Sequence, residues 1–175
     1  MNWNSVIQVA IFLATVILLA KPLGTYMARV YEGKSAGLNV VLGPLERWIY
    51  RLSGIETETG MSWKGYAIAM MLFNGIGIVV VYTLQRLQAY LPLNPMSMPG
   101  VAPDLVFNTA VSFATNTNWQ SYGGETTLSC LTQMAGLTVQ NFVSAATGMA
   151  VLVALIRGFI QKKSDTIGNF WVDLR

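Results

Sequence analysis

The residues best suited to chemistry lie in one stretch, 104–125, where an apolar run changes abruptly to a polar one. Residues 104–114 read DLVFNTAVSFA, and residues 115–125 read TNTNWQSYGGE. The apolar run predicts a helix about 16 Å long, roughly half the thickness of a membrane's hydrocarbon core. Free carbonyls at its end, near Ala114 and Thr115, would stabilise a dehydrated cation. We expect residues 115–119 to return outward in extended form, since each residue spans about 3.3 Å.

The neighbours of this stretch favour a position inside a membrane. Pro103 and Asp104 suit a helix start, and a membrane-length apolar run lies on each side. The order helix, half-helix, polar loop, helix is the unit of cation pores of the potassium-channel type. A second interpretation stays open, in which the polar residues form a loop outside the membrane and residues 104–114 lie on its surface. The flanking runs and the sharp change in polarity favour the pore.

The composition indicates a membrane protein. Of 175 residues, 53% are hydrophobic and 11% are charged, whereas soluble domains carry about 25% charged residues. The chain has no histidine and one cysteine, Cys130, so an internal disulfide and Ser-His or Cys-His catalysis are excluded within it. We expect no transition-metal site and, without a glycine-rich phosphate loop, no nucleotide site in this chain.

Three uncharged or nearly uncharged runs predict an all-α protein with three transmembrane helices, at residues 3–20, 66–84 and 135–156. Lys21 and Pro22 are expected to end the first helix. In the polar connection that follows, residues 44–52 predict an amphipathic helix, which either lies along the membrane interface or packs against neighbouring helix ends. The proline-rich segment 86–103 predicts a non-helical descent into the central stretch. The polar half of the third run is expected to face protein or water.

These elements divide the chain into four parts. We expect an N-terminal transmembrane helix at 1–20, a cytoplasmic connection with the interfacial helix at 21–64, a helix–pore loop–helix repeat at 65–163, and a cytoplasmic tail at 164–175. Orientation follows from the positive-inside rule. The connection holds six basic residues and the chain after the third predicted helix holds four, whereas the segment 86–133 holds one and the N-terminus holds none. This places the N-terminus outside and the end of the chain inside. The six and the four are Lys21, Arg29, Lys34, Arg47, Arg51, Lys64, Arg157, Lys162, Lys163 and Arg175.

Several motifs together resemble one family. They are KPLG at 21–24, YLPLNP at 90–95, NTAVSF at 108–113, TNTNWQSYGGETTL at 115–128, QMAGLTVQNF at 133–142 and GNFWVDL at 168–174. The chain resembles the N-terminal part of the potassium-binding, channel-like A subunit of the bacterial Kdp potassium-transporting ATPase. This resemblance covers nearly the whole chain.

The resemblance implies a fold of four pore-loop repeats around one potassium path, of which this chain supplies an extra N-terminal helix and the first repeat. It implies that Thr115, Asn116, Thr117 and Asn118 form one segment of the selectivity filter, with Gln120 at its outer edge. The segment departs from channel filters of the Thr-Val-Gly-Tyr-Gly kind because it has no glycine. The chain also stops at Arg175, before the family's other three repeats, so we expect a fragment or a truncation.

The implied function is potassium binding and translocation in an ATP-driven, P-type, high-affinity import complex of the bacterial plasma (inner) membrane. No catalytic residues are expected in this chain: ATP and magnesium would bind to a partner B subunit, which the family combines with C and F subunits. Two alternatives stay open. One is a potassium channel or ion-coupled permease subunit built from the same repeat, and the other is a truncated membrane fragment that transports nothing.

Overall fold

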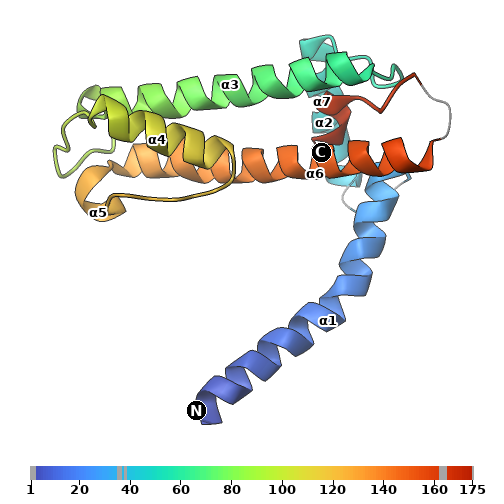
Figure 1. The fold of residues 1–175 in the computed structure, drawn as a ribbon, viewed down its shortest axis with the longest axis horizontal. Coiled ribbons are helices and arrows are strands. Elements are labelled where there is room, and N and C mark those ends of the chain that lie inside the picture. Colours follow the sequence, from blue (N-terminus) through green and yellow to red (C-terminus); the bar gives the residue numbers. More distant parts are fainter. Residues whose placement is uncertain (1–2, 35–36, 38, 162–164, 175) are drawn as a thin grey trace. The chain divides into compact units, whose positions relative to one another are not determined.

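The computed structural model describes residues 3–34, 37, 39–161 and 165–174, and within them all regular structure is helical (Figure 1). Lys162, Lys163 and Arg175, which entered the orientation argument, lie outside these residues. The chain forms two compact units, Met1–Glu56 and Thr57–Arg175, each with its own arrangement of helices. Among the described residues, three helices are long and apolar enough to cross a membrane: Trp3–Tyr31, Trp63–Tyr90 and Thr132–Ile160. The expected all-α architecture with three such helices is therefore confirmed.

The first unit contains helices α1 (Trp3–Tyr31) and α2 (Asn39–Ser53). Helix α1 does not end at Lys21 and Pro22 as we expected, but continues through Pro22 to Tyr31. Proline removes one backbone hydrogen bond from a helix, and the bonds on either side of it can still form. The Thr25 hydroxyl donates to the Lys21 carbonyl over 2.9 Å and supports this region. Within the described part of α1, charged residues occur only after Ala20, at Lys21 and Arg29.

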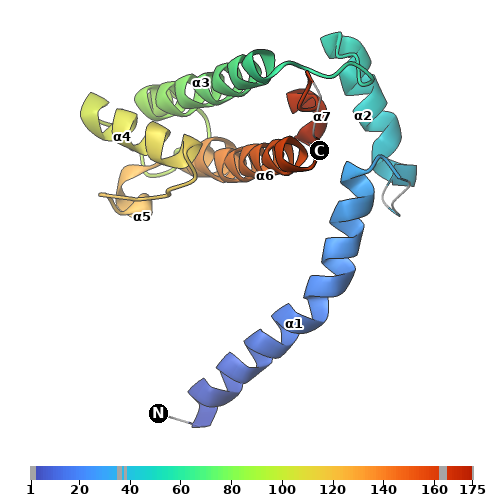
Figure 2. The ribbon, with the colours of Figure 1, turned by 45° about the vertical axis from the view of Figure 1, so that its right-hand side comes forward.

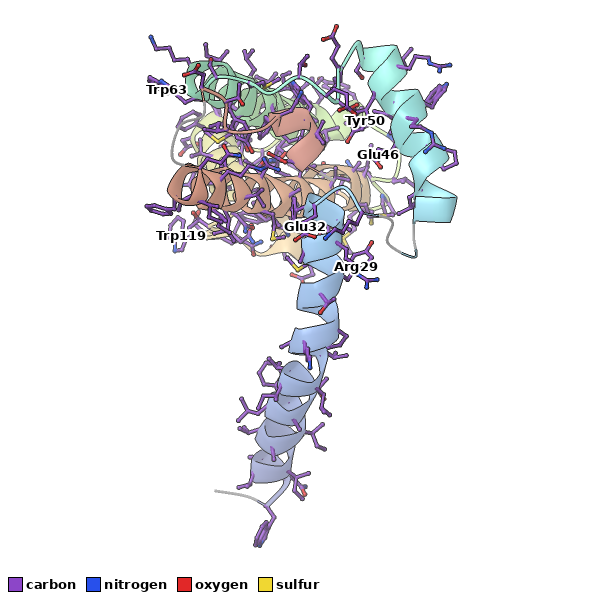
Figure 3. All side chains as sticks on the ribbon, turned by 90° about the vertical axis from the view of Figure 1, so that its right-hand side faces the viewer. Arg29, Glu32, Glu46, Tyr50, Trp63 and Trp119 are labelled. Atoms are coloured by element: carbon purple, nitrogen blue, oxygen red, sulfur yellow. The ribbon has the colours of Figure 1, made fainter. Side chains whose placement is uncertain are left out.

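Helix α2 includes the predicted amphipathic segment and extends it at its N-terminal end. Its apolar side chains are exposed, and on a different face the Tyr50 hydroxyl donates to Glu46 Oε1 over 2.8 Å (Figure 3). The large apolar residues that are exposed are Leu42, Leu45, Trp48, Ile49 and Leu52. This pattern agrees with an amphipathic helix, and its position at a membrane interface stays a prediction.

The second unit is built on two long helices, α3 (Trp63–Leu87) and α6 (Val139–Ile160), which lie side by side with the shorter α4 (Pro103–Ala114) (Figures 1 and 2). Ser62 begins α3 by accepting a hydrogen bond from the Gly65 N–H over 3.3 Å. A short 3₁₀ turn, η1 (Gln88–Tyr90), follows α3, and a π-helix, η2 (Thr132–Thr138), leads directly into α6. The single-turn helix α5 (Gly124–Thr127) lies between the polar loop and η2.

Helix α4 is fixed on α3 by a core of buried apolar side chains. Val106 and Ala110 of α4 are fully buried, and they meet Val81 of α3 and Leu137 of η2. The full set of buried residues in this core is Val81, Val101, Val106, Ala110, Phe113, Leu128 and Leu137. Burial of apolar area stabilises this arrangement at roughly 25 cal/mol per Å². One face of α4 is therefore committed to the core, and its C-terminal end has a fixed position.

The Gln88 side chain ties together the segments around that core. It is completely buried, and its Nε2 donates to the carbonyls of Pro99 (2.6 Å) and Thr127 (2.8 Å). Its Oε1 accepts from the Ser129 N–H over 3.0 Å and from the Thr132 hydroxyl over 3.3 Å. One amide thus connects the end of α3 to the descending segment and to the segment that precedes α6. Apart from η1, residues 88–102 are non-helical, as the prolines predicted.

The other end of the helix pair is closed by the last described residues. Helix α7 (Phe170–Asp173) lies between α3 and α6, with Phe170 fully buried (Figure 1). The Phe170 ring makes edge-to-face contacts with Tyr66 and Phe73, at centroid distances of 5.4 and 5.7 Å. Backbone hydrogen bonds from the Met61 N–H to the Gly168 carbonyl (2.7 Å) and from the Ile167 N–H to the Met61 carbonyl (3.1 Å) hold the segment.

A buried ion pair secures α7 to α6. The Arg157 guanidinium donates two hydrogen bonds to the Asp173 carboxylate, over 2.5 Å from Nη1 to Oδ2 and 2.9 Å from Nη2 to Oδ1. Asp173 is only 2% exposed, and the Tyr66 hydroxyl lies 3.1 Å from its Oδ2. Gly168 has φ +112°, and a Cβ there would collide with the Arg157 guanidinium, so this position requires glycine.

Replacing Arg157 with methionine would leave the buried Asp173 carboxylate without its cation. We expect the free energy of unfolding to fall by about 3 kcal/mol, as for other broken buried pairs. Thermal unfolding of the detergent-purified protein, followed by tryptophan fluorescence, measures the loss. The double variant Arg157→Met, Asp173→Leu removes both charges and should recover part of it. A single variant as stable as the wild type would show that the pair contributes nothing.

Replacing Gln88 with leucine keeps the side-chain volume but removes the four hydrogen bonds of the Gln88 side chain. The buried Ser129 N–H and the carbonyls of Pro99 and Thr127 would lose their partner, and we expect a loss of about 3 kcal/mol in the same unfolding experiment. Gln8→Leu on α1, where the glutamine is exposed, is the matched control and should change stability by less than about 0.5 kcal/mol. Equal effects of the two substitutions would contradict the role given to Gln88.

Candidate functional site

The candidate site begins at the C-terminal end of α4, where the expected change from helix to polar loop occurs. Pro103 occupies the first turn of this helix and Asp104 lies beside its positive end, as the sequence predicted. The last turn is held by the buried side chains of Phe113 and Ala114. The helix ends at Ala114, and the next residues, 115–121, are exposed. The core under α4 therefore presents the start of the loop at a defined point.

The loop does not run in extended form, and this expectation was wrong. Thr115 has φ −86° and ψ 5°, Asn116 has φ +55°, Thr117 has a negative φ, and Asn118 has φ +54°. The backbone therefore alternates between negative and positive φ. Asparagine is one of the few residues other than glycine that adopt the left-handed region readily. The two asparagines allow this alternation in a segment that contains no glycine.

The backbone N–H groups of residues 115–118 turn back toward the end of α4. Thr115 and Asn116 donate to the carbonyls of Val111 (2.9 Å) and Phe113 (3.2 Å), and Thr117 and Asn118 both donate to the Ser112 carbonyl, over 2.9 and 3.2 Å. In a trans peptide the carbonyl points opposite to the N–H, and the described residues contain no cis peptide. The carbonyls of residues 114–117 therefore point away from α4.

This pattern decides which oxygens are free to bind a cation. We expected free carbonyls near Ala114 and Thr115, and the carbonyls of both residues point away from the helix. Those of Val111, Ser112 and Phe113 accept hydrogen bonds from the loop, so the outward oxygens are those of residues 114–117. The helix end still contributes, because it orients the loop peptides and leaves their negative ends outward.

Side chains add hydroxyl oxygens and fix the two ends of the loop. The Thr115 hydroxyl lies 2.9 Å from the Val111 carbonyl and 3.0 Å from the Thr117 hydroxyl. At the other end, the Ser112 hydroxyl donates to the Trp119 carbonyl over 3.0 Å. The Trp119 and Gln120 side chains are exposed, and Figure 3 shows Trp119 at the surface of the second unit.

Helix α6 reaches the loop through its polar half. Ser144 is 4% exposed, and its hydroxyl lies 3.4 Å from Asn116 Oδ1 and 3.2 Å from the Asn141 carbonyl. Gln140 and Thr147 on the same helix are also buried, so the polar half faces protein as expected. Gln140 lies directly against Gly77 of α3, where a Cβ would come within 2.5 Å of its Oε1. The two long helices thus approach each other closely at Gly77 and Gln140.

The electrostatics of the site are those of neutral dipoles. Among the described residues no group of three or more His, Cys, Asp or Glu side chains could hold a metal ion. Burial raises the pKa of the Tyr122 phenol above its ordinary value of 10.0, so this group is uncharged at neutral pH. Glu125 is the acidic residue nearest to the loop in sequence, and it is exposed. Such a site can offer carbonyl and hydroxyl oxygens to a monovalent cation, without a fixed negative charge.

The structure brings together all four predicted filter residues, Thr115 to Asn118, in one turn of backbone, and places Gln120 just beyond it. Sequence reasoning missed Ser112. The signal was a hydroxyl residue three positions before the polar change, but the same half-helix also holds Asn108 and Thr109, and serines often bond to their own helix. The partner of Ser112 is the backbone carbonyl of Trp119, and because every residue has such a carbonyl, the residue type at this position does not indicate the bond.

Comparison with known proteins gives one consistent result. The family model described as potassium-transporting ATPase A subunit matches residues 10–175. A potassium-transporting ATPase potassium-binding subunit from Methylococcus capsulatus is 63% identical over 174 residues, which are 99% of this chain and 29% of the relative. Subunits of the same name from Sorangium cellulosum and Chromobacterium violaceum are 63% and 59% identical over 99% of this chain, or 30% and 29% of their own lengths.

The chain therefore spans about three-tenths of the length of these curated relatives. The family match covers nearly all of the described residues, including the whole of α4, the loop and α6. The chain belongs to the potassium-transporting ATPase A subunit family.

Proposed function

We propose that this chain forms the first pore repeat of the potassium-binding and translocating subunit of an ATP-driven, P-type, high-affinity potassium importer. In this proposal α4 is a re-entrant pore helix, residues 115–118 form one filter segment, and Gln120 lies at its outer edge. The observation that carries the proposal is the outward row of carbonyls at residues 114–117, in an uncharged loop between two membrane-length helices.

The chemistry of the loop suits a potassium ion that must bind and then leave. Carbonyl oxygens replace the hydration shell of a monovalent cation, and either cavity size or the number and field strength of the oxygens selects potassium over sodium. Neutral oxygens bind the ion without the strong attraction that a carboxylate would add. One loop supplies oxygens from one side only, so a complete shell requires the further repeats that the family resemblance implies.

The energy source lies elsewhere in the proposed complex. The relatives are named as subunits of an ATPase, and we expect ATP and magnesium to bind to a B subunit, with C and F subunits completing the assembly. The complex lies in the bacterial inner membrane. The basic residues of this chain favour a cytoplasmic connection between α1 and α3 and an external entry to the loop.

The proposal is tested by transport in a full-length subunit, in which these 175 residues replace the matching part of the Methylococcus capsulatus relative. Produced with that organism's partner subunits in bacteria that lack high-affinity potassium uptake, the chimera should restore growth at low potassium. Asn116→Ala or Gln120→Ala should raise the potassium concentration for half-maximal uptake severalfold, since each changes the filter segment or its edge.

Gln8→Ala on α1 is the matched control and should transport like the parent chimera. Uptake that persists after ATP depletion would favour a channel or ion-coupled permease over an ATP-driven importer. If neither Asn116→Ala nor Gln120→Ala alters the potassium dependence, the filter assignment is wrong and the loop lies outside the ion path.

A second pair of variants separates backbone from side-chain binding at Asn118. Glycine adopts a positive φ freely, whereas alanine pays about 1 kcal/mol there. If the backbone carbonyls bind the ion, Asn118→Gly should keep potassium affinity within about twofold, and Asn118→Ala should weaken it by up to about fivefold. Potassium-stimulated ATPase activity of the purified complex measures both. Equal losses in the two variants would instead show that the amide side chain is a ligand.

A further inference from the structure

The hydroxyl of Ser112 joins the two ends of the candidate filter loop. Ser112 lies in the last turns of α4 and is 8% exposed. Its side chain donates to the Trp119 carbonyl over 3.0 Å, while its own carbonyl accepts the N–H groups of Thr117 and Asn118. The same residue therefore fixes the middle of the loop through its backbone and the end of the loop through its side chain.

The bond to Trp119 has a geometric consequence for the carbonyl row. The carbonyls of residues 114–117 point away from α4, but that of Trp119 points back to it, because it accepts from Ser112. The row of outward carbonyls thus stops before Trp119. The Trp119 carbonyl belongs to the peptide that connects Trp119 to Gln120. The bond from Ser112 therefore also fixes the position of Gln120.

The bond is also the side-chain contact that closes the loop onto its own helix. The Thr115 hydroxyl bonds only near the start of the loop, at the carbonyls of Val111 and Ser112 and the Thr117 hydroxyl. Ser144 touches the Asn116 side chain from α6 at the longer distance of 3.4 Å. Without the Ser112 hydroxyl, the Trp119 peptide would lose its anchor on α4 and could rotate in the exposed part of the loop.

We propose that Ser112 is a positioning residue for potassium selection: its hydroxyl ends the carbonyl row and holds Gln120 at the filter's edge. This inference rests on the proposed function of the loop. Ser112 itself does not contact the ion, because its hydroxyl is directed to Trp119 and its carbonyl to the loop N–H groups. Its loss should alter affinity and selectivity more than the maximal rate of ATP hydrolysis.

The test uses the full-length chimera assembled with its partner subunits. Ser112→Ala should raise the potassium concentration for half-maximal ATPase activity about threefold to tenfold, with a maximal rate within twofold of the parent. The ratio of rubidium to potassium stimulation should rise, and this ratio does not depend on the amount of assembled protein. Ser112→Thr keeps the hydroxyl and should restore both values to near those of the parent.

Thr109→Val is the matched control on the same helix. Thr109 is buried like Ser112, but its hydroxyl donates to the carbonyl of Leu105 within α4, over 2.8 Å. This variant should leave the half-maximal concentration and the selectivity ratio within twofold of the parent. If Ser112→Ala does not assemble, Ser112→Cys keeps the size of the side chain with a weaker donor and should show the same shift in direction.

The outcomes separate this inference from the proposed function. If Asn118→Ala weakens potassium affinity but Ser112→Ala does not, the filter stands and the positioning role of Ser112 is wrong. A shift in Thr109→Val as large as in Ser112→Ala would also overturn it, since any buried hydroxyl of α4 would then have the same effect. If the parent complex shows no potassium stimulation, the proposed function fails, and this inference fails with it.

Discussion

The structure depends on one constraint: in a membrane, every backbone N–H and C=O that leaves a helix needs another partner. The second unit meets it at the end of α4, where the carbonyls of Val111, Ser112 and Phe113 accept four successive N–H groups from residues 115–118. These hydrogen bonds give partners both to these carbonyls of α4 and to the N–H groups of the loop. They also leave the carbonyls of residues 114–117 turned away from α4. If the loop lies at membrane depth as proposed, these carbonyls would need a partner there, and a cation could supply it.

The asparagines explain how a segment without glycine achieves this geometry. Turning successive N–H groups to the same side requires φ to alternate in sign, and filters of the Thr-Val-Gly-Tyr-Gly kind place glycine where φ is positive. Here Asn116 and Asn118 occupy the positive positions, at +55° and +54°, and threonines alternate with them. Each β-branched threonine keeps a negative φ, which its side chain requires. The TNTN pattern at 115–118 therefore provides the alternation in the sign of φ without glycine, and the Asn116 side chain also contacts Ser144.

The sequence predicted the parts of the fold that depend on local patterns of residues. It did not predict the parts that depend on single contacts between residues far apart in the chain. Apolar run length located the three long helices, and Pro103 with Asp104 located the start of α4. The end of α1 was misplaced because Pro22 disturbs a helix without necessarily stopping it. The path of the loop was misjudged because polarity says nothing about the sign of φ. The junction at Gln88 joins residues 39 and 41 positions apart, and the docking of α7 depends on Tyr66 and Arg157. No short-range pattern contains such pairs.

Different interactions hold the two ends of the helix pair formed by α3 and α6. At one end, edge-to-face aromatic contacts and the buried Arg157–Asp173 pair lock α7 between α3 and α6. At the other, the Gln88 amide joins α3 to the segments that lead into α4 and η2. The long helices are thus held at both ends, and α4 packs on α3 through its buried core. If the loop binds an ion as proposed, oxygens held in this way need little reordering when the ion binds. Oxygens that resist moving would also let small differences in ion size contribute to selectivity.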